Sequence, residues 1–451
     1  MSSTAAALSV LVCLALAACR PPAVETATAA PPPAPAVKLD EDQSICLAET
    51  SGSPVVDGDI RKSLELARKL PLKPDSWVAA GRGWVRKARY TSDPGFYVNV
   101  AACVAAALAV EPDYLPALEL RGLALMNEHR FAEAAELARS LLARDPASVI
   151  ALGLASDALL ELGRFEEAAA AAQQLMDVKP GMAAYSRSSY FRWLQGDRAN
   201  AKRLIRDALK AGRDARDPEP AAWTFVEAAR IYASEGDYDG ADAVYAEALK
   251  WVPDYPAALV GRARVALARD DPRRALAWLE TAYRVNPLAE TAWLLGDARS
   301  ALGDAEGARA AYDRVIETGR RIDRLTLATF YATRDRDREE AVRLLEEERE
   351  VRGGVYVDDA YAWALYRAGR LREARAASDS SLRLGTDDAR LYYHAGAIRL
   401  AQGDASGRKL VARALALNPG FDWTGAAEAR ALLGREKTAT VAGAAPGPAG
   451  S

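Results

Sequence analysis

Histidine, cysteine and isoleucine are all scarce in this chain. Its 451 residues include only two histidines and four cysteines, which leaves little from which to build a zinc or other transition-metal site. Isoleucine occurs eight times, and a chain poor in β-branched residues has little preference for strands. We therefore expect no metal, no cofactor and no fold built on β-sheets.

An excess of positive charge is also absent. The 59 basic residues face 62 acidic ones, for a formal net charge of −3. Proteins that bind nucleic acid normally carry a basic surplus that displaces counterions from the phosphates, so we expect no nucleic acid among the partners. Half of the residues are hydrophobic, which excludes a chain that is disordered throughout. Alanine, leucine, arginine and glutamate are abundant and form helices readily, which predicts an all-α fold.

The N-terminal segment has the pattern of an export signal. Residues 5–18 form an apolar run that is long enough for a signal peptide and short for a membrane span. The run ends in Leu16-Ala17-Ala18-Cys19, which resembles the lipobox of bacterial lipoproteins. This resemblance implies a signal peptide at 1–18, a lipid anchor on Cys19 and a location in the cell envelope facing the periplasm. An ordinary cleaved signal peptide or a short buried helix is the alternative.

Both ends of the chain are predicted to lie outside the fold. Residues 19–58 begin with a proline- and alanine-rich stretch and are interpreted as a linker that holds the domain away from the lipid. Arg20 follows the lipobox cysteine, where an aspartate retains such lipoproteins at the inner membrane, so the resemblance favours the outer membrane. Residues 435–451 are rich in alanine, glycine and proline and are predicted to be a disordered tail.

The region between these ends repeats with a period of about 34 residues. Pro112, Pro146 and Pro180 are 34 residues apart, and so are Pro253 and Pro287. Glycine ends a helix easily because it adopts left-handed backbone conformations, and it recurs at Gly163, Gly196, Gly236, Gly303, Gly369 and Gly403. A small residue that lets two helices cross closely follows at Ala134, Ala168, Ala201, Ala241, Ala275, Ala308, Ala341 and Ala374.

This pattern resembles the tetratricopeptide repeat, a pair of antiparallel helices that stacks on copies of itself. The resemblance implies an α-solenoid, a right-handed superhelix over residues 59–434, in which each pair buries its apolar sides only against its neighbours. A capping helix is expected near 423–433. The ten predicted helix pairs lie near 77–112, 115–146, 149–180, 183–212, 222–253, 256–287, 289–320, 322–352, 355–386 and 389–420.

Two cysteines remain in the mature domain if Cys13 leaves with the signal peptide and Cys19 is acylated. In an exported protein, Cys46 and Cys103 are candidates for a disulfide that fastens the preceding segment to the first repeat. The alternative is that Cys103 is a small buried helix residue.

Catalytic motifs are lacking as well. The sequence contains no phosphate-binding glycine loop, no nucleophile elbow and no His-Glu-x-x-His motif, so we expect no enzyme. His129 is interpreted as a turn residue between two helices.

In proteins with this repeat, the first helices of the pairs line a concave groove that receives a peptide or a partner protein. The resemblance therefore implies a non-enzymatic scaffold or adaptor of the cell envelope. A glycan or small-molecule binder, or an accessory subunit of an envelope enzyme, is the alternative. The candidate groove residues are Arg187, Phe191, Trp223, Glu227, Arg230, Arg264, Asp359, Trp363, Tyr393 and His394. Aromatic and arginine side chains are common anchors at interfaces, although inter-repeat packing is the competing interpretation for each aromatic residue.

Overall fold

The computed structural model describes residues 39–213 and 217–442, with side chains described up to residue 434. Every regular element in these ranges is helical, and no strand occurs among them. The helices are α1 (Glu41–Cys46), α2 (Pro54–Lys69), α3 (Pro74–Thr91), the 3₁₀ turn η1 (Pro94–Phe96), α4 (Tyr97–Val110), α5 (Leu115–Asn127), α6 (Phe131–Arg144), α7 (Val149–Glu161), α8 (Phe165–Val178), α9 (Met182–Leu194), α10 (Arg198–Ala211), α11 (Pro218–Ser234), α12 (Tyr238–Trp251), α13 (Pro256–Ala268), α14 (Pro272–Val285), α15 (Ala289–Ala301), α16 (Ala305–Ile322), α17 (Arg324–Thr333), α18 (Arg338–Val351), α19 (Val355–Arg367), α20 (Leu371–Ser381), α21 (Ala389–Ala401), α22 (Gly407–Leu417) and α23 (Gly425–Ala442).

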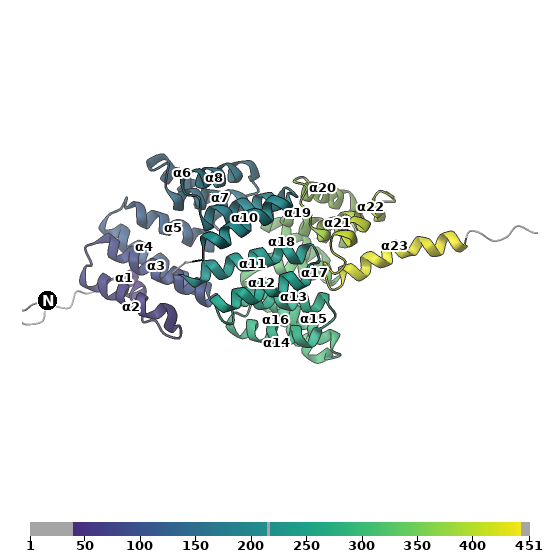
Figure 1. Ribbon diagram of the computed structural model, residues 1–451, viewed down its shortest axis with the longest axis horizontal. Coiled ribbons are helices and arrows are strands. Elements are labelled where there is room, and N and C mark those ends of the chain that lie inside the picture. Colours follow the sequence, from purple (N-terminus) through teal and green to yellow (C-terminus); the bar gives the residue numbers. More distant parts are fainter. Residues whose placement is uncertain (1–38, 214–216, 443–451) are drawn as a thin grey trace, which may run out of the picture. The chain divides into compact units, whose positions relative to one another are not determined.

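The helices from α3 to α22 form ten successive pairs, each with its two helices packed side by side (Figure 1). The ten pairs coincide with the ten predicted ranges, and α23 follows them as the predicted capping helix. The prediction of an all-α solenoid of helix pairs is therefore confirmed.

The recurring glycines have the backbone conformation, and the recurring alanines the burial, that the repeat predicts. The six predicted glycines at the ends of first helices all have positive φ, from 71° at Gly196 to 81° at Gly303. In pairs without this glycine, His129, Asp270 and Asp335 take the same left-handed conformation, with φ between 54° and 60°. The alanines that follow are buried, with exposed fractions of 0–4%. His129 is thus a turn residue, as its position in the repeat indicates.

The folded region begins earlier than predicted, because residues 41–58 are not a linker. Helix α1 starts with a capping box at Asp40, and α2 follows from Pro54. The indole Nε1 of Trp84 donates to the carbonyl of Cys46 at 2.8 Å, and the structure joins Cys46 to Cys103 in a disulfide. The predicted boundary at residue 59 is wrong because a few strong contacts fasten this segment to α3 and α4.

A buried ion pair adds to this attachment. Lys87 on α3 and Asp57 on α2 are 2.5 Å apart, with side chains 2% and 4% exposed. The ammonium group of Lys87 also donates to Thr50 Oγ1 at 2.8 Å and to the carbonyl of Ser51 at 2.6 Å. Each buried polar group therefore has a partner, which a buried charge requires.

At the other end, α23 continues to Ala442 and overlaps the segment predicted as a tail by eight residues. The rest of that segment, 443–451, lies outside the described residues. The predicted signal peptide at 1–18 and the lipidation site Cys19 also lie outside them.

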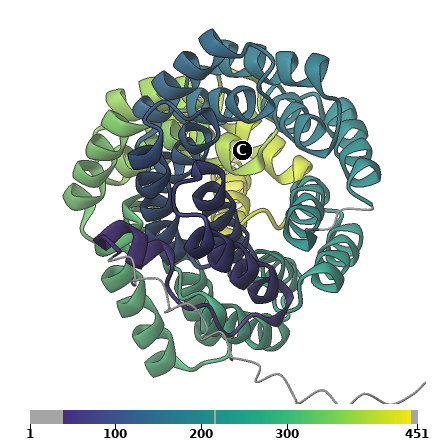
Figure 2. The ribbon, with the colours of Figure 1, turned by 90° about the vertical axis from the view of Figure 1, so that its left-hand side faces the viewer.

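The array within residues 40–442 winds far enough for helices distant in sequence to meet (Figure 2). Trp193 Nε1 donates to the hydroxyl of Tyr356 at 3.1 Å, and Thr386 Oγ1 donates to the carbonyl of Leu194 at 2.6 Å. Further along, Asn418 Nδ2 donates to the carbonyl of Ala233 at 2.9 Å. These residues are 163–192 positions apart.

The expectation that each pair meets only its neighbours therefore needs correction. Packing between helices is largely sequential, but hydrogen bonds at helix ends and loops join one turn of the superhelix to the next. These contacts hold the turns at a fixed spacing around the interior.

Candidate functional site

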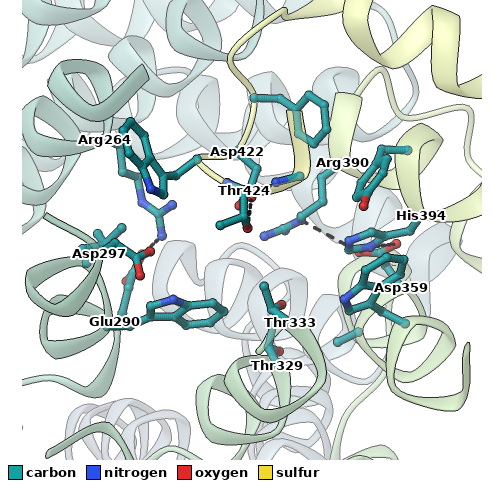
Figure 3. A pocket seen from close by; sticks show the side chains of 18 of the residues that line it. Arg264, Glu290, Asp297, Thr329, Thr333, Asp359, Arg390, His394, Asp422 and Thr424 are labelled. Carbon is teal, nitrogen blue, oxygen red and sulfur yellow. Dashed lines mark hydrogen bonds and ion pairs between the residues drawn. The ribbon is translucent and has the colours of Figure 1, made fainter. Parts of the chain in front are cut away.

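A cavity of about 330 Å³ lies on the inner side of the C-terminal half of the array. Its walls are the first helices α13, α15, α17, α19 and α21, together with the loop from Gly420 to Thr424 and the start of α23 (Figure 3). The cavity is thus enclosed by five successive repeats and by the segment that follows the last one.

The lining residues follow one helical face. The second, fifth and ninth positions of α15 are Glu290, Trp293 and Asp297, and all three line the cavity. The same positions of α19 hold Tyr356, Asp359 and Trp363, which also line it. Residues three and four apart share one side of a helix, so α15 and α19 turn the same stripe inward.

Aromatic rings cover much of the wall around α19 and α21. Trp363 stacks on His394 with ring centroids 4.1 Å apart and planes 14° apart. Tyr393 lies 5.5 Å from Trp363 and 5.4 Å from Phe421, centroid to centroid. Trp293 and Trp423 complete the aromatic lining. Packed rings of this kind suit the burial of an apolar or flat group.

One side of the cavity carries an ion pair and a buried carboxylate. Arg264 Nη2 lies 2.5 Å from Glu290 Oε1. The side chain of Glu290 is 46% exposed. Partial loss of hydration in the cavity would raise its pKa, but the nearby guanidinium groups of Arg264, Arg230 and Arg390 outweigh this effect and lower the pKa below its usual value. Glu290 is therefore charged at neutral pH. Nearby, Asp297 Oδ1 accepts hydrogen bonds from Arg334 and from the hydroxyl of Tyr312, the latter at 2.9 Å.

The opposite side holds a histidine–aspartate pair and an arginine. His394 Nδ1 lies 3.0 Å from both carboxylate oxygens of Asp359, and both residues are buried. Arg390 Nε is 3.9 Å from Asp359 Oδ2, while its side chain is 43% exposed. Burial opposes the charge of Arg390, yet the carboxylates of Asp388 and Asp359 raise its pKa above the usual value.

The loop before α23 closes the cavity. Asp422 Oδ1 accepts from the backbone N–H of Thr424 at 3.0 Å and of Gly425 at 2.6 Å, so it caps the first turn of α23. The hydroxyl of Tyr393 donates to Glu428 Oε2 at 2.6 Å. These bonds fix the loop against α21.

The structure brings five of the ten predicted groove residues together in this cavity. They are Arg264, Asp359, Trp363, Tyr393 and His394. The last four are also buried and pack on one another, so inter-repeat packing and cavity lining are combined in the same side chains.

The other five predicted residues lie outside the cavity. Arg187 is paired with Asp157 at 2.5 Å, and Arg230 with Glu227 at 2.7 Å. Trp223 is 43% exposed. Phe191 is 6% exposed and meets Phe165 on α8 edge to face at 5.4 Å. This contact favours the alternative of inter-repeat packing for Phe191.

Sequence reasoning missed Glu290, Trp293, Asp297, Arg390 and Asp422. The first four lie on the same helical stripe as the predicted residues, so applying one register to every first helix would have found them. Asp422 belongs to the loop after the last repeat, where the repeat pattern gives no signal.

Within the described ranges, no group of three or more histidine, cysteine or acidic side chains could hold a metal ion. No helix in the same ranges is both long and apolar enough to span a membrane.

Family models of the tetratricopeptide repeat match residues 101–149, 119–183, 232–287 and 260–321. Residues 101–183 and 232–321 therefore contain tetratricopeptide repeats, in agreement with the repeat pattern and the helix pairs. No curated protein sequence matches it.

Solved structures with a similar arrangement are distant in sequence. A human IFIT1 dimer with PPP-AAAA is 14% identical, with a TM-score of 0.46, over 84% of this chain and 95% of that chain. A tetratricopeptide repeat protein from Parabacteroides merdae is 18% identical, with a TM-score of 0.39, over 59% of this chain and 98% of that chain. PilW, described as a type IV pilus biogenesis factor, is 17% identical, with a TM-score of 0.40, over 48% of this chain and 97% of that chain.

Proposed function

We propose that this protein is a partner-binding scaffold of the bacterial cell envelope, anchored through a lipid on Cys19 and facing the periplasm. A peptide or a segment of another protein is received on the inner face of the superhelix. Catalysis is not part of this function. Arrays of tetratricopeptide repeats suggest protein interaction in general, and the envelope location is inferred from the lipobox-like segment.

One observation carries the proposal of an inner binding face. The charged residues of the first helices remain accessible although the superhelix surrounds them: the side chains of Arg230, Arg264 and Glu290 are 60%, 51% and 46% exposed. Side chains that served only to pack repeats together would be buried. Their exposure on the inner side leaves them available to a ligand.

The binding face can be tested by filling the cavity. Thr333 on α17 lines it, so Thr333→Trp should exclude a ligand, whereas Arg273→Trp changes an exposed position on the second helix α14. After crosslinking in cells, we expect a partner to be recovered with the wild-type protein and with Arg273→Trp but not with Thr333→Trp. Equal recovery with both variants would contradict binding in the cavity.

The anchor requires a separate experiment. Metabolic labelling with a fatty acid should label the wild-type protein and not a Cys19→Ser variant, and mass spectrometry should place the acylated cysteine at the mature N-terminus. An unlabelled protein that fractionates with soluble periplasmic proteins would contradict the anchor. Separation of inner and outer membranes tests the outer-membrane assignment.

The cavity also favours a second candidate function. A site of about 330 Å³ with aromatic walls and a few polar groups resembles small-molecule sites more than an open peptide groove. A binder of glycans or small molecules, or an accessory subunit of an envelope enzyme, would use it in this way. Thermal-shift screening distinguishes the two, because a small ligand in excess over its Kd raises the unfolding temperature.

A further inference from the structure

Hydrophobic side chains are exposed together on the helix that precedes the ten pairs. From residue 150 onward, the exposed large hydrophobic residues of the described chain occur singly, and the nearest two, Val285 and Leu302, are 17 residues apart. By contrast, four of them occur within residues 55–72, namely Val55, Leu66, Leu70 and Leu72. A single exposed hydrophobic residue is ordinary on a protein surface, whereas a group of them marks a surface that binds something.

Val55, Leu66 and Leu70 lie on one side of α2. Val55 and Leu66 are 11 residues apart, which is about three helical turns, and Leu70 follows Leu66 by four residues, about one turn. The opposite side of the helix, with Ile60 and Leu64, is buried, and the main neighbour of α2 is α3. Helix α2 therefore has one side that is packed and one side that is hydrophobic and exposed.

Leu72 is at the tip of the turn between α2 and α3. The backbone N–H of Lys73 donates to the carbonyl of Leu70 at 3.0 Å, which closes the turn. Pro71 and Pro74 flank the tip, and their rings restrict the backbone dihedrals. Leu72 is 82% exposed, more than any other large hydrophobic residue in the described chain, and this restricted backbone holds it outward.

The place of α2 in the fold leaves this surface without a neighbouring repeat. Figure 1 shows α2 at the N-terminal end of the array, next to α3. The end of a solenoid is normally closed by a helix with a polar outer side, because no further repeat packs on it. A hydrophobic outer side in this place indicates that another kind of surface covers it.

Basic side chains surround the exposed leucines. The exposed charged residues within 54–73 are five basic and two acidic ones, namely Arg61, Lys62, Arg68, Lys69, Lys73, Asp59 and Glu65. The remaining acidic residue, Asp57, is buried and paired with Lys87. The acidic residues of α1 lie on another side, because α1 packs mainly against α4. A surplus of three positive charges thus accompanies the exposed leucines, although the whole chain has a formal net charge of −3.

An anionic lipid bilayer matches both features of this surface. Leucine side chains enter the boundary between headgroups and acyl chains, and lysine side chains beside them reach the lipid phosphates. The length of chain before α1 favours the same occupant. Twenty residues, 20–39, separate Cys19 from Asp40, and they span at most about 70 Å. A domain attached at Cys19 therefore keeps its N-terminal helices within reach of the bilayer.

We propose that the outer side of α2, with Leu72 at the tip of the following turn, binds the surface of an anionic membrane. This contact adds to the lipid on Cys19 and holds the N-terminal end of the array against the bilayer. It gives the superhelix a fixed orientation, which a tether of twenty residues alone does not provide. The inference rests on the envelope location in the proposed function, but not on the lipid itself or on the ligand of the inner cavity.

Flotation with phospholipid vesicles tests the contact without the lipid anchor. The mature chain carrying Cys19→Ser is mixed with vesicles of phosphatidylethanolamine and phosphatidylglycerol, and in parallel with vesicles of phosphatidylcholine alone. We expect binding to the anionic vesicles that is about tenfold tighter or more than to the neutral ones and that weakens at high ionic strength. Absence of binding to the anionic vesicles, or equal binding to both kinds, would overturn the proposal.

Matched variants locate the contact. Leu72→Gln should weaken vesicle binding by about tenfold, because the side chain no longer enters the bilayer. Ile322→Gln, which changes an exposed hydrophobic residue at the end of α16, should leave binding unchanged. Thermal unfolding verifies that both variants are folded. Equal binding by the two variants would refute a contact through Leu72.

Two lysines provide the corresponding test of charge. Lys69 and Lys250 are both 69% exposed, and each is paired with a glutamate of its own helix. Lys69→Gln should weaken binding to anionic vesicles by about fivefold, because one lysine near the lipid surface is lost, and Lys250→Gln should not change it. Equal binding by these two variants would contradict the role of the basic residues on α2.

A second copy of the chain is the competing occupant of this surface. Sedimentation velocity without vesicles should give the same oligomeric state for the Cys19→Ser chain with and without Leu72→Gln. A dimer that dissociates on Leu72→Gln would assign the surface to self-association and overturn the proposal. Fatty-acid labelling of Cys19 and the recovery experiment with Thr333→Trp do not depend on flotation, so the anchor, the inner site and this contact fail separately.

Discussion

Replacement of Gly196 by alanine should loosen the contact between successive turns of the superhelix. Gly196 ends α9 with φ +71°, and a β-carbon added there would lie 2.5 Å from the carbonyl oxygen of Gly385 in the next turn. Since a carbon–oxygen contact needs about 3.3 Å, the two turns must separate by nearly 1 Å. Gly403→Ala is a matched control, because Gly403 has φ +78° and nothing within 4 Å of the added carbon.

The expected loss of stability follows from this comparison. Alanine in a left-handed conformation costs about 1 kcal/mol at either position. At Gly196, separation of the turns also breaks the buried hydrogen bond from Thr386 to Leu194 and weakens the pair formed by Arg198 and Asp387. Losing a buried hydrogen bond costs about 1–3 kcal/mol. We therefore expect Gly196→Ala to destabilise the protein by roughly 3 kcal/mol and Gly403→Ala by roughly 1 kcal/mol.

Urea unfolding measures the two losses, and hydrogen–deuterium exchange locates them. Gly196→Ala should accelerate exchange around residues 190–200 and also around 380–390, although the two segments are far apart in sequence. Equal destabilisation by the two variants, with exchange changed only near residue 196, would refute the contact between turns.

Three further predictions concern the N-terminal helices. Lys87→Met leaves the carboxylate of Asp57 buried without its cation and should lower the free energy of unfolding by about 3–5 kcal/mol. Chemical denaturation measures this loss. The double variant Lys87→Met with Asp57→Leu should recover part of it. Burial opposes the ionisation of Asp57, but its hydrogen bond from Lys87 brings its pKa below the ordinary 3.8. Its stabilising contribution is therefore complete above about pH 4 and is lost as the pH falls below that value. The loss of stability between pH 7 and pH 3 should accordingly be larger in the wild type than in Asp57→Asn. Cys103→Ser removes the disulfide that closes a loop of 57 residues and should lower the free energy of unfolding by about 4 kcal/mol. Without reductant, the variant should unfold at a lower temperature than the wild type. Adding a reductant should lower the unfolding temperature of the wild type and leave that of the variant unchanged.

The repeats could be predicted from the sequence because each local feature has a local cause. Gly163 and its equivalents end helices wherever they occur, and Ala134 and its equivalents are small wherever two helices cross. Six such glycines and eight such alanines, at a spacing of about 34 residues, indicate the helix pairs and their order. His129 was predicted to be a turn residue for the same reason, because it occupies the position of the turn glycine in its repeat.

The attachment of α1 and α2 could not be predicted in this way. It depends on a few pairings, such as Lys87 with Asp57 and Trp84 with the carbonyl of Cys46, that occur once in the chain. Only the two cysteines gave a signal, which is why a disulfide was considered while the helices around it were assigned to a linker.

The contacts between turns of the superhelix could not be predicted from the sequence either. The backbone N–H of Gly353 donates to the carbonyl of Glu161 at 2.8 Å, and backbone atoms carry no sequence signature. How far the array winds is set by small rotations between successive pairs. The sequence likewise gave no signal for which candidate residues meet in one cavity, and five of the ten line it.

Site-specific photo-crosslinking in cells tests the central claim most directly, which is that this superhelix receives its partner in the inner cavity. A photoreactive amino acid is placed at Thr333 in the cavity, and in a matched strain at Arg273 on α14. The account predicts a defined adduct from position 333 and none from position 273. Adducts from position 273 alone would show that the partner binds the outer surface and would contradict it.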